Sequence, residues 1–376
     1  MKIIYVITKW KEHGGAQYHV RLLAERMQSV GHEVLVVSGP EGHRAEQSNS
    51  STIEDRIIPT MGRGINLVKD FQALLSLVKM LRKEKPDLVS GHSSKAGLLG
   101  AIASKVSGIP YVYTAHSWAF LQSSSRLRNT LYLFLWRTLG RLVGHVICVS
   151  DFDRKIALQY GIVQSKNTST VLNGLVDLEK DSEPISRLSE EVRAISVGRL
   201  SEPKDFPFLI SVIARTEQIL LDIVGQGPQR GYLERLIKDL DVGNRVRLLG
   251  DREDVPGLMG GYDLVVLMSK SEGLPFVVLE GMRALKPVVA SRVGGIGEVI
   301  IDGETGFLVD IGDSETLFSR LTQLADNANL RKKLGEAGRE RFLNNFLIEP
   351  MFSKTIDIYG ICIRNHHQSK RDGDCI

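Results

Sequence analysis

The stretch SEGLPFVVLEGM carries two carboxylates, Glu272 and Glu280, eight positions apart. Two carboxylates flanking one bond act as general acid and base, whereas two that accept hydrogen bonds from vicinal hydroxyls hold a sugar or a ribose. Gly273 and Pro275 disfavour a helix at Glu272, and Pro275 suits a first helical turn. The pattern therefore predicts Glu272 in a loop and Glu280 about a turn and a half inside a helix. It favours two anchors on one bound molecule over an acid–base pair.

Two cations lie close together in the stretch VGRLSEPKDF, where Lys204 follows Arg199 by five positions. On a loop after a strand they suit a diphosphate, although two solvated surface cations would look the same. Gly14, Gly15 and Ala16 follow the first apolar run and open a helix, where backbone N–H groups suit a phosphate. A plain tight turn is the alternative there.

Histidines follow two further predicted strands. His116 comes after one strand in YTAHSW, and His92 and Lys95 come after the preceding strand in GHSSKAG. A single histidine at a strand end is often a structural residue, but three such side chains at neighbouring strand ends favour a site. No carboxylate cluster has the spacing of metal ligands, and the cysteines form no CxxC pair, so we predict no metal site. The three cysteines are Cys148, Cys362 and Cys375.

A glycine-rich loop supports an alternative function. Gly225, Gly227 and Gly231 form G-x-G-x-x-x-G after a predicted strand, close to a dinucleotide fingerprint. The acidic residue expected after the next strand is matched only loosely by Asp251, 26 residues beyond Gly225. Pro228 at the start of the helical turn also argues against it. An NAD(P)-dependent oxidoreductase using this loop remains the alternative hypothesis.

Two runs of alternating strands and helices position these residues. The alternation predicts two α/β domains with mostly parallel sheets, facing each other across a cleft. We assign 1–174 to the first domain, 175–191 to a polar linker and 192–350 to the second domain. Residues 351–376 would form a helix that crosses back to the first domain, followed by a polar, disordered tail from RNHHQSKRDGDCI. The predicted strands are KIIYVIT, HEVLVVSG, KPDLVSGHS, IPYVYTAH, RLVGHVICVS, RAISVGRL, ILLDIVG, RVRLLG, DLVVLMS and PVVAS.

The charge of the chain is unevenly distributed. Residues 1–180 hold 23 Lys and Arg against 14 Asp and Glu, and the remainder holds 25 against 30, which together give the net charge of +4. A basic first half and an acidic second half suggest different partners, or simple drift in surface charge. The unpaired cysteines fit a reducing compartment. The N-terminus does not read as a signal peptide, and no uncharged stretch is long enough to span a bilayer, so we expect a cytoplasmic location.

Five motifs in order resemble those of the retaining glycosyltransferases of the GT-B fold known as glycosyltransferase family 4. SEGLPFVVLEGM is similar to the E-x7-E signature, GGAQ to the first phosphate loop, and VGRLSEPKDF to the G-R-L…K motif. VGQGP resembles the G-x-G-P turn, and VGGIGEVIIDGETGFLV resembles the G-G-x-x-E…G-x-x-G-x-L-V stretch. The resemblance covers nearly the whole chain and removes the dinucleotide interpretation of the glycine loop.

The resemblance implies how a nucleotide-diphosphate sugar, which we expect to be a UDP-sugar, would be bound. Arg199 and Lys204 would bind the diphosphate with help from the Gly15 backbone, and Glu280 would hold the ribose. The positive groups would stabilise the departing diphosphate, where charge develops. The reaction would retain the anomeric configuration without a metal or a cofactor.

The same resemblance assigns the sugar end of the site. Glu272 would bind the hydroxyls of the donor sugar, with backbone N–H groups from Gly273, Leu274 and Phe276. His116 would lie near the sugar and its anomeric centre. Glu272 and His116 are thus the expected catalytic residues.

The segment HSSKAGLLGAIASKVSGIPYVYTAHSWAF further resembles a subgroup that builds bacterial surface polysaccharides on lipid-linked carriers. Acceptors there are polyprenyl-diphosphate sugars, so His92 and Lys95 become acceptor-side candidates. A basic first half would then face the anionic inner side of the cytoplasmic membrane, and no nucleic-acid partner is expected.

Segment 118–146 mixes aromatic and basic side chains, as a helix on a membrane surface does. An ordinary amphipathic core helix is the alternative. The residues concerned are Trp118, Phe120, Trp136, Arg126, Arg128, Arg137 and Arg141.

Two positions depart from the family pattern. Gly297 stands where the family usually has proline, and Leu285 stands where it usually has a helix-ending glycine. We therefore expect either a positive φ at Leu285 or a different helix end.

Overall fold

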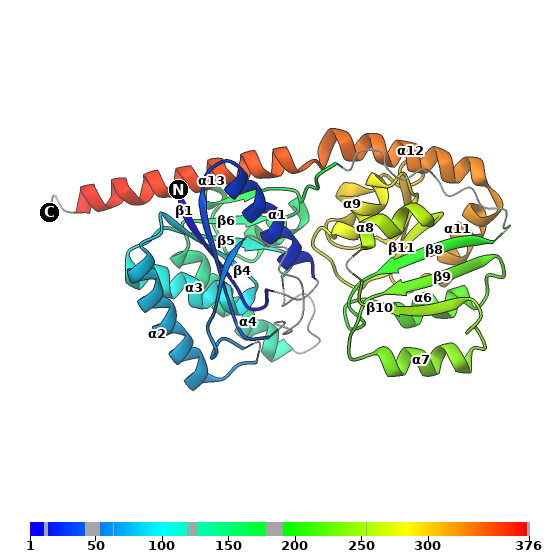
Figure 1. The fold of residues 1–376 in the computed structure, drawn as a ribbon, viewed down its shortest axis with the longest axis horizontal. Helices are drawn as coiled ribbons and strands as arrows, with labels where there is room; N and C mark the ends of the chain where they lie inside the picture. Colours follow the sequence, from blue (N-terminus) through cyan, green and yellow to red (C-terminus); the bar gives the residue numbers. More distant parts are fainter. Residues whose placement is uncertain are drawn as a thin grey trace. The chain divides into compact units, whose positions relative to one another are not determined.

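The computed structural model divides into two compact units, residues 1–172 with 349–376, and residues 173–348 (Figure 1). Most of the expected linker lies outside the described residues. The structure describes residues 1–10, 14–41, 53–62, 64–118, 120, 126–177, 191–252 and 254–373.

The first unit is built on a seven-stranded parallel sheet in the order β3-β2-β1-β4-β5-β6-β7. Its strands are β1 (Lys2–Ile7), β2 (Glu33–Ser38), β3 (Glu54–Ile57), β4 (Leu88–His92), β5 (Tyr111–Ala115), β6 (His145–Cys148) and β7 (Thr168–Thr170). Its helices are α1 (Gly15–Ser29), α2 (Leu67–Glu84), α3 (Ser94–Ser107), α4 (Arg126–Leu142), α5 (Asp151–Gln159), the 3-10 turn η2 (Ser165–Asn167) and α13 (Ile348–Gly373). In Figure 1, α1 and α13 lie on one side of the sheet, and α2, α3 and α4 on the other.

The second unit is built on a six-stranded parallel sheet in the order β10-β9-β8-β11-β12-β13. Its strands are β8 (Val192–Val197), β9 (Ile219–Val224), β10 (Val246–Gly250), β11 (Leu264–Leu267), β12 (Val288–Ser291) and β13 (Gly306–Val309). Its helices are α6 (Phe206–Ile213), α7 (Arg230–Asp239), α8 (Val255–Leu258), the 3-10 turn η3 (Met259–Gly261), α9 (Phe276–Arg283), α10 (Ile296–Val299), α11 (Ser314–Asp326) and α12 (Ala328–Asn345).

Both sheets reverse their strand order at one place, between β1 and β4 in the first unit and between β8 and β11 in the second. Ligands of open α/β sheets bind beyond the carboxyl ends of strands at such switch points. The expected α/β architecture with two Rossmann-like sheets is thus confirmed, and it places the candidate residues after the strands on which they were predicted.

The C-terminal helix belongs to the first unit apart from its opening residue. The prediction of a disordered polar tail is wrong over residues 364–373, which continue α13. His366 Nε2 donates to Gly108 O at 2.9 Å, and Lys370 Nζ donates to the same oxygen at 2.8 Å. Gly108 ends α3 with a positive φ of 67°, where carbonyl groups lack helical partners. Two donors of this helical tail thus satisfy the carbonyl at the end of α3.

The aromatic side chains of segment 118–146 lie in the core. Trp118 is fully buried, Trp136 is 4% exposed, and their rings meet edge to face with centroids 5.0 Å apart. Trp136 also packs against Tyr113 of β5, and Phe120 is buried as well. These three buried aromatic side chains cannot contact a membrane, so the membrane-surface interpretation is wrong for them, while α4 exposes Leu131 and Phe134 on its surface. The side chains of Arg126 and Arg128 lie outside the described residues.

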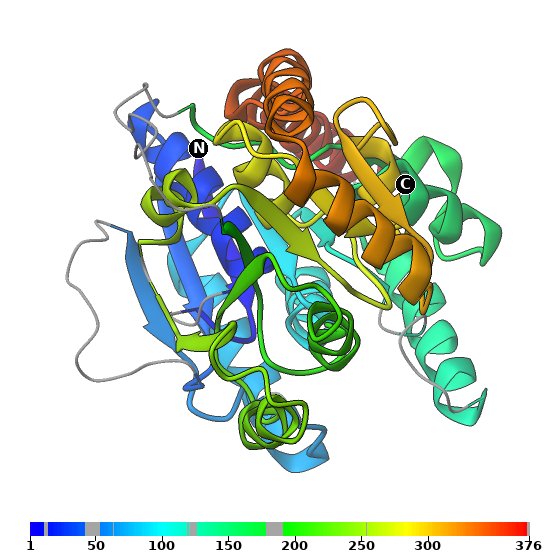
Figure 2. The ribbon, with the colours of Figure 1, turned by 90° about the vertical axis from the view of Figure 1, so that its right-hand side faces the viewer.

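Leu285 follows α9 with a φ of 59°, the left-handed conformation expected at a family glycine position. Helix α12 approaches the backbone closely at this residue. A β-carbon on Gly335 of α12 would come within 2.0 Å of the Leu285 carbonyl oxygen, so only glycine fits there. Figures 1 and 2 show α12 running beside α9, which carries the second glutamate of the opening motif.

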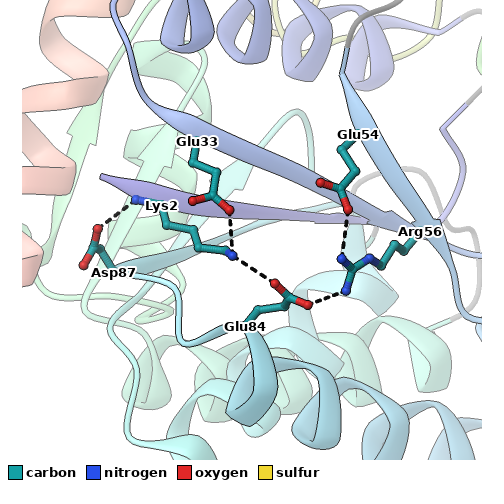
Figure 3. Close-up of polar contacts among 6 residues, drawn as sticks. All are labelled: Lys2, Glu33, Glu54, Arg56, Glu84 and Asp87. Carbon is teal, nitrogen blue, oxygen red and sulfur yellow. Dashed lines mark hydrogen bonds and ion pairs between the residues drawn. The ribbon is translucent and has the colours of Figure 1, made fainter.

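An ion-pair network lies at the end of the first sheet that is opposite the candidate residues (Figure 3). Lys2 Nζ lies 2.7 Å from Glu33 and 2.9 Å from Glu84, and Glu84 also pairs with Arg56. Arg56 in turn reaches Glu54 at 2.8 Å. Hydrogen bonds from Lys2 and then Arg56 lower the pKa of Glu84 to about 2. The network therefore contributes stability above pH 4.5 that is lost as the pH falls towards 2.

Candidate functional site

The loop after β8 is held in place by the glycine-rich loop after β9. Leu200 N donates to Gln226 O at 2.9 Å. A β-carbon on Gly225 would lie 2.0 Å from Gly198 O, and one on Gly227 would lie 2.3 Å from Leu200 O. Both glycines are needed because one loop backbone packs directly on the other. This contact explains the G-x-G spacing without a dinucleotide, and it positions the exposed Arg199.

The loops after β8 and β11 are tied together by their backbones. Asp205 N donates to Met268 O at 2.9 Å, and Lys270 N donates to Pro203 O at 2.8 Å. The side chains meet as well, because Lys204 Nζ lies 2.6 Å from Glu272 Oε1. Both side chains are mostly buried, with 15% and 13% of their surfaces exposed. The structure thus brings together two candidates that lie 68 residues apart in the sequence.

The backbone around Glu272 is fixed from a third loop. Gly295 N donates to Gly273 O at 2.8 Å. Gly294 has a φ of 55°, and a β-carbon there would lie 1.8 Å from Glu272 O. Any other residue at Gly294 would displace the carboxylate loop.

A residue that sequence reasoning missed supports the same loop. Asn173 is buried, and its Nδ2 donates to Leu274 O at 2.7 Å. Leu274 and Phe276 are themselves buried at the start of α9, as expected for residues that present backbone N–H groups at a helix end. The only sequence signal for Asn173 was its place in VLNG, directly before the predicted linker.

Glu280 is the fifth residue of α9, as predicted, and only 8% of it is exposed. Burial raises the pKa of Glu280 to about 7, although the neighbouring Arg283 partly opposes that shift. Among the described residues, none forms a hydrogen bond with the Glu280 carboxylate. A buried carboxylate without a protein partner is suited to accept hydrogen bonds from a ligand.

This pKa gives a testable pH dependence. If the ionised Glu280 accepts hydrogen bonds from ribose hydroxyls, donor binding should strengthen as the pH rises through about 7. We expect the Kd of a nucleotide-sugar, measured by calorimetry, to fall several-fold between pH 6 and pH 8. The diphosphate diester of such a ligand does not titrate in this range.

Glu280→Gln provides the control, because the amide keeps the shape and cannot ionise. Its binding should be independent of pH over the same range. A pH-independent Kd for the unchanged protein would contradict the ribose role. Without ligand, the raised pKa means that stability falls as the pH rises from about 4.5 to about 7, and the variant should lack this slope.

Three histidines gather in the first unit, and one of them was not predicted. His92 ends β4, His116 follows β5, and His19 lies one turn inside α1. His92 Nδ1 lies 3.0 Å from His116 Nε2, and the His19 and His116 ring centroids are 4.7 Å apart. Burial lowers the pKa of both His92 and His116 well below the usual value. These rings are therefore neutral at pH 7.

The three imidazoles each offer a nitrogen, all within 4.8 Å of one another, which is the spacing a metal ion would accept. Sequence reasoning missed His19 because it lies on the apolar face of α1, among Val20, Leu22 and Leu23. The expectation of no metal site stays a prediction.

The remaining two candidates have different surroundings. Gly15 is the first residue of α1, after an extended Gly14, so its N–H lies at a helix start as predicted. Lys95 Nζ pairs with Asp70 of α2 and donates to Gly64 O. This pairing neutralises the charge of Lys95, so an acceptor-side role would require the ion pair to open.

Comparison with known proteins identifies the class. Residues 177–341 match the family model for glycosyl transferases group 1, and residues 13–180 match the model for glycosyltransferase family 4. The chain is 30% identical over 321 residues to the Escherichia coli UDP-Gal:alpha-D-GlcNAc-diphosphoundecaprenol alpha-1,3-galactosyltransferase, covering 80% of this chain and 82% of that protein.

Solved structures show the same architecture. Sucrose-phosphate synthase from Thermosynechococcus elongatus superposes with a TM-score of 0.82 at 21% identity, covering 97% of this chain and 100% of that one. Anabaena HepE in complex with UDP and glucose gives 0.80 at 23% identity, covering 95% and 98%. Together with the two family models, the two Rossmann-like units show a glycosyltransferase of the GT-B fold. The chain belongs to glycosyltransferase family 4.

Proposed function

We propose that this glycosyltransferase moves a sugar from a UDP-linked donor to a lipid-linked acceptor in bacterial surface-polysaccharide biosynthesis, with retention of configuration and without a metal. The observation that carries the proposal is the Lys204–Glu272 pair at the switch point of the second sheet, with Arg199 on the loop after β8 and Glu280 in the helix after β11. The E. coli relative, whose name specifies UDP-galactose and a diphosphoundecaprenol acceptor, supports the choice of donor and acceptor class. Nothing in the comparisons supports the oxidoreductase alternative.

The chemistry assigns one task to each group. The C1–oxygen bond to the diphosphate breaks, a C1–oxygen bond to the acceptor hydroxyl forms, and the hydroxyl proton leaves with the diphosphate. Arg199 and Lys204 stabilise the charge that develops on the leaving diphosphate. Glu272 orients the sugar through its hydroxyls, and Glu280 holds the ribose.

Three further assignments follow the family resemblance. Gly15 donates its N–H to the diphosphate, and His116 lies by the anomeric centre. His92 was predicted on the acceptor side, but it is fully buried and both of its ring nitrogens lie within hydrogen-bond distance of protein groups, so it does not contact the acceptor directly. These roles place the transfer step at the carboxyl ends of the strands.

Incubation with UDP-, GDP-, dTDP- and ADP-sugars and a polyprenyl-diphosphate-linked acceptor tests the reaction. We expect turnover with a UDP-sugar, an unchanged rate in EDTA, and a product whose anomeric proton coupling by NMR matches that of the donor. An inverted product would contradict the mechanism. Loss of activity in EDTA that a divalent ion restores would also contradict it, and would point to the three histidines.

Contact with the membrane is the remaining part of the proposal, and α2 is the surface that suits it. Large apolar side chains at its start are each more than half exposed, and its exposed charged residues are basic. Its two acidic residues, Asp70 and Glu84, are held in ion pairs. The apolar residues are Ile65, Leu67, Val68, Phe71 and Leu75, and the basic ones are Lys69, Lys79, Arg82 and Lys83.

An exposed apolar row beside basic residues matches an anionic bilayer surface at the cytoplasmic face. Among the described residues, no helix is long and apolar enough to cross a membrane. Contact through α2 would bring the first unit to the surface where a lipid-linked acceptor resides.

Replacing Leu67 and Phe71 together by glutamate tests this surface. We expect partitioning onto phosphatidylglycerol-rich vesicles, measured by flotation, to fall more than about 10-fold, because two apolar contacts are lost and two negative charges are added. Ile311→Glu, at an exposed apolar residue of the second unit, should bind as the unchanged protein does. Equal binding of the double variant would exclude α2 as the contact.

A further inference from the structure

A chain of hydrogen bonds runs from the C-terminal helix to His116 within the first unit. Tyr359 OH of α13 donates to Ser90 Oγ at 2.8 Å, and Ser90 Oγ lies 3.2 Å from His92 Nε2. His92 Nδ1 then lies 3.0 Å from His116 Nε2. Tyr359, Ser90 and His92 are fully buried. Water therefore does not compete for the first links of the chain.

The chain of hydrogen bonds has a preferred direction. Ser90 accepts from Tyr359 and has one proton of its own to donate, which His92 Nε2 can accept. If Ser90 accepted from both Tyr359 and a His92 Nε2–H, the buried Ser90 proton would have no acceptor among the described residues. An unsatisfied buried donor is destabilising, so the forward direction prevails.

The forward direction fixes the tautomers of both rings. With Nε2 accepting from Ser90, neutral His92 carries its proton on Nδ1 and donates it to His116 Nε2. His116 then has its lone pair engaged at Nε2 and its proton on Nδ1.

We propose that Tyr359, Ser90 and His92 are positioning residues that hold His116 in the Nδ1-protonated tautomer. The ring then offers a hydrogen-bond donor to an oxygen of the donor sugar and no proton at Nε2. This inference rests on the proposed place of His116 beside the sugar. It means that α13, from the far end of the chain, determines which nitrogen of His116 can donate.

The direct test is ¹⁵N NMR of the full chain labelled at histidine, with the His116 signals assigned by their loss in His116→Gln. Ring nitrogens with and without a proton differ strongly in chemical shift. We expect a protonated Nδ1 and a bare Nε2 at His116, and a mixture of the two tautomers in Ser90→Ala and Tyr359→Phe. A protonated Nε2 in the unchanged protein would overturn the proposal.

Kinetics supply the second readout. In Ser90→Ala we expect kcat to fall about 2- to 10-fold, because two tautomers of similar energy coexist, while KM for the donor stays unchanged. Ser90→Thr keeps the hydroxyl and should restore both the tautomer and kcat. Full turnover in a Ser90→Ala protein with mixed tautomers would exclude a positioning role.

A matched control separates this effect from general loss of stability. Tyr111 OH donates to Gly97 O at 2.7 Å, also buried in the first unit, so Tyr111→Phe removes a comparable hydrogen bond that is not a link between Tyr359 and His116. It should leave the His116 tautomer and kcat unchanged. Full turnover in His116→Ala would refute the proposed place of His116 beside the sugar. The tautomer would still be tested independently, because the NMR measurement needs no substrate.

Discussion

Replacing Glu272 by glutamine is expected to lower kcat about 10²-fold with little change in KM for the donor. The amide keeps the size of the side chain but accepts hydrogen bonds from sugar hydroxyls less strongly than a carboxylate does. Orientation of the sugar matters most in the transition state, so the loss should appear in turnover rather than in binding. Steady-state kinetics with the preferred UDP-sugar measures both constants.

The chain contains a matched control for this variant. Glu202 pairs with Lys270 across the same two loops at 3.0 Å, but both side chains are largely exposed. Glu202→Gln therefore removes an equivalent ion pair outside the buried cluster, and kcat should be unaffected. If Glu272→Gln turned over as fast as Glu202→Gln, Glu272 would have no role in orienting the sugar.

Lys204→Met is expected to weaken donor binding about 10- to 150-fold, the range for losing a hydrogen bond to a charged group. In the ligand-free protein Lys204 is paired with Glu272, so an arriving diphosphate must share or replace that partner. The affinity for UDP, measured by calorimetry, should fall accordingly, and the loss should shrink at high salt.

The neighbouring cation again provides the comparison. Lys270→Met removes a lysine from the adjacent loop whose partner is Glu202, and UDP affinity should change little. Equal losses in Lys204→Met and Lys270→Met would indicate a general effect of charge rather than a diphosphate contact.

Sequence patterns predicted the central strands but missed three at the sheet edges. β3, β7 and β13 are each terminal in their sheets, and none has more than four residues. An edge strand needs less apolar sequence because one side lacks a neighbouring strand, and EDRI in β3 shows no apolar run at all. Central strands, buried on both faces, carry the continuous apolar runs that reveal them.

For the candidate site, the sequence predicted which strand ends carry chemistry but not which side chains meet. Glu272 in a loop and Glu280 in a helix followed from the Gly-Leu-Pro break, and the structure confirms both positions. The Lys204–Glu272 pair and the Asn173 support join residues far apart in the chain. No local pattern encodes such contacts, because they arise only when the loops fold together.

The division of the chain has a consequence for synthesis on the ribosome. The first unit needs residues 349–376, yet the whole second unit, 173–348, is translated before them. The second unit can therefore complete its sheet while the first still lacks α13 and the Tyr359 bond to Ser90. Premature termination before α13 would leave the second unit complete and the first unit without this helix and its Tyr359 bond.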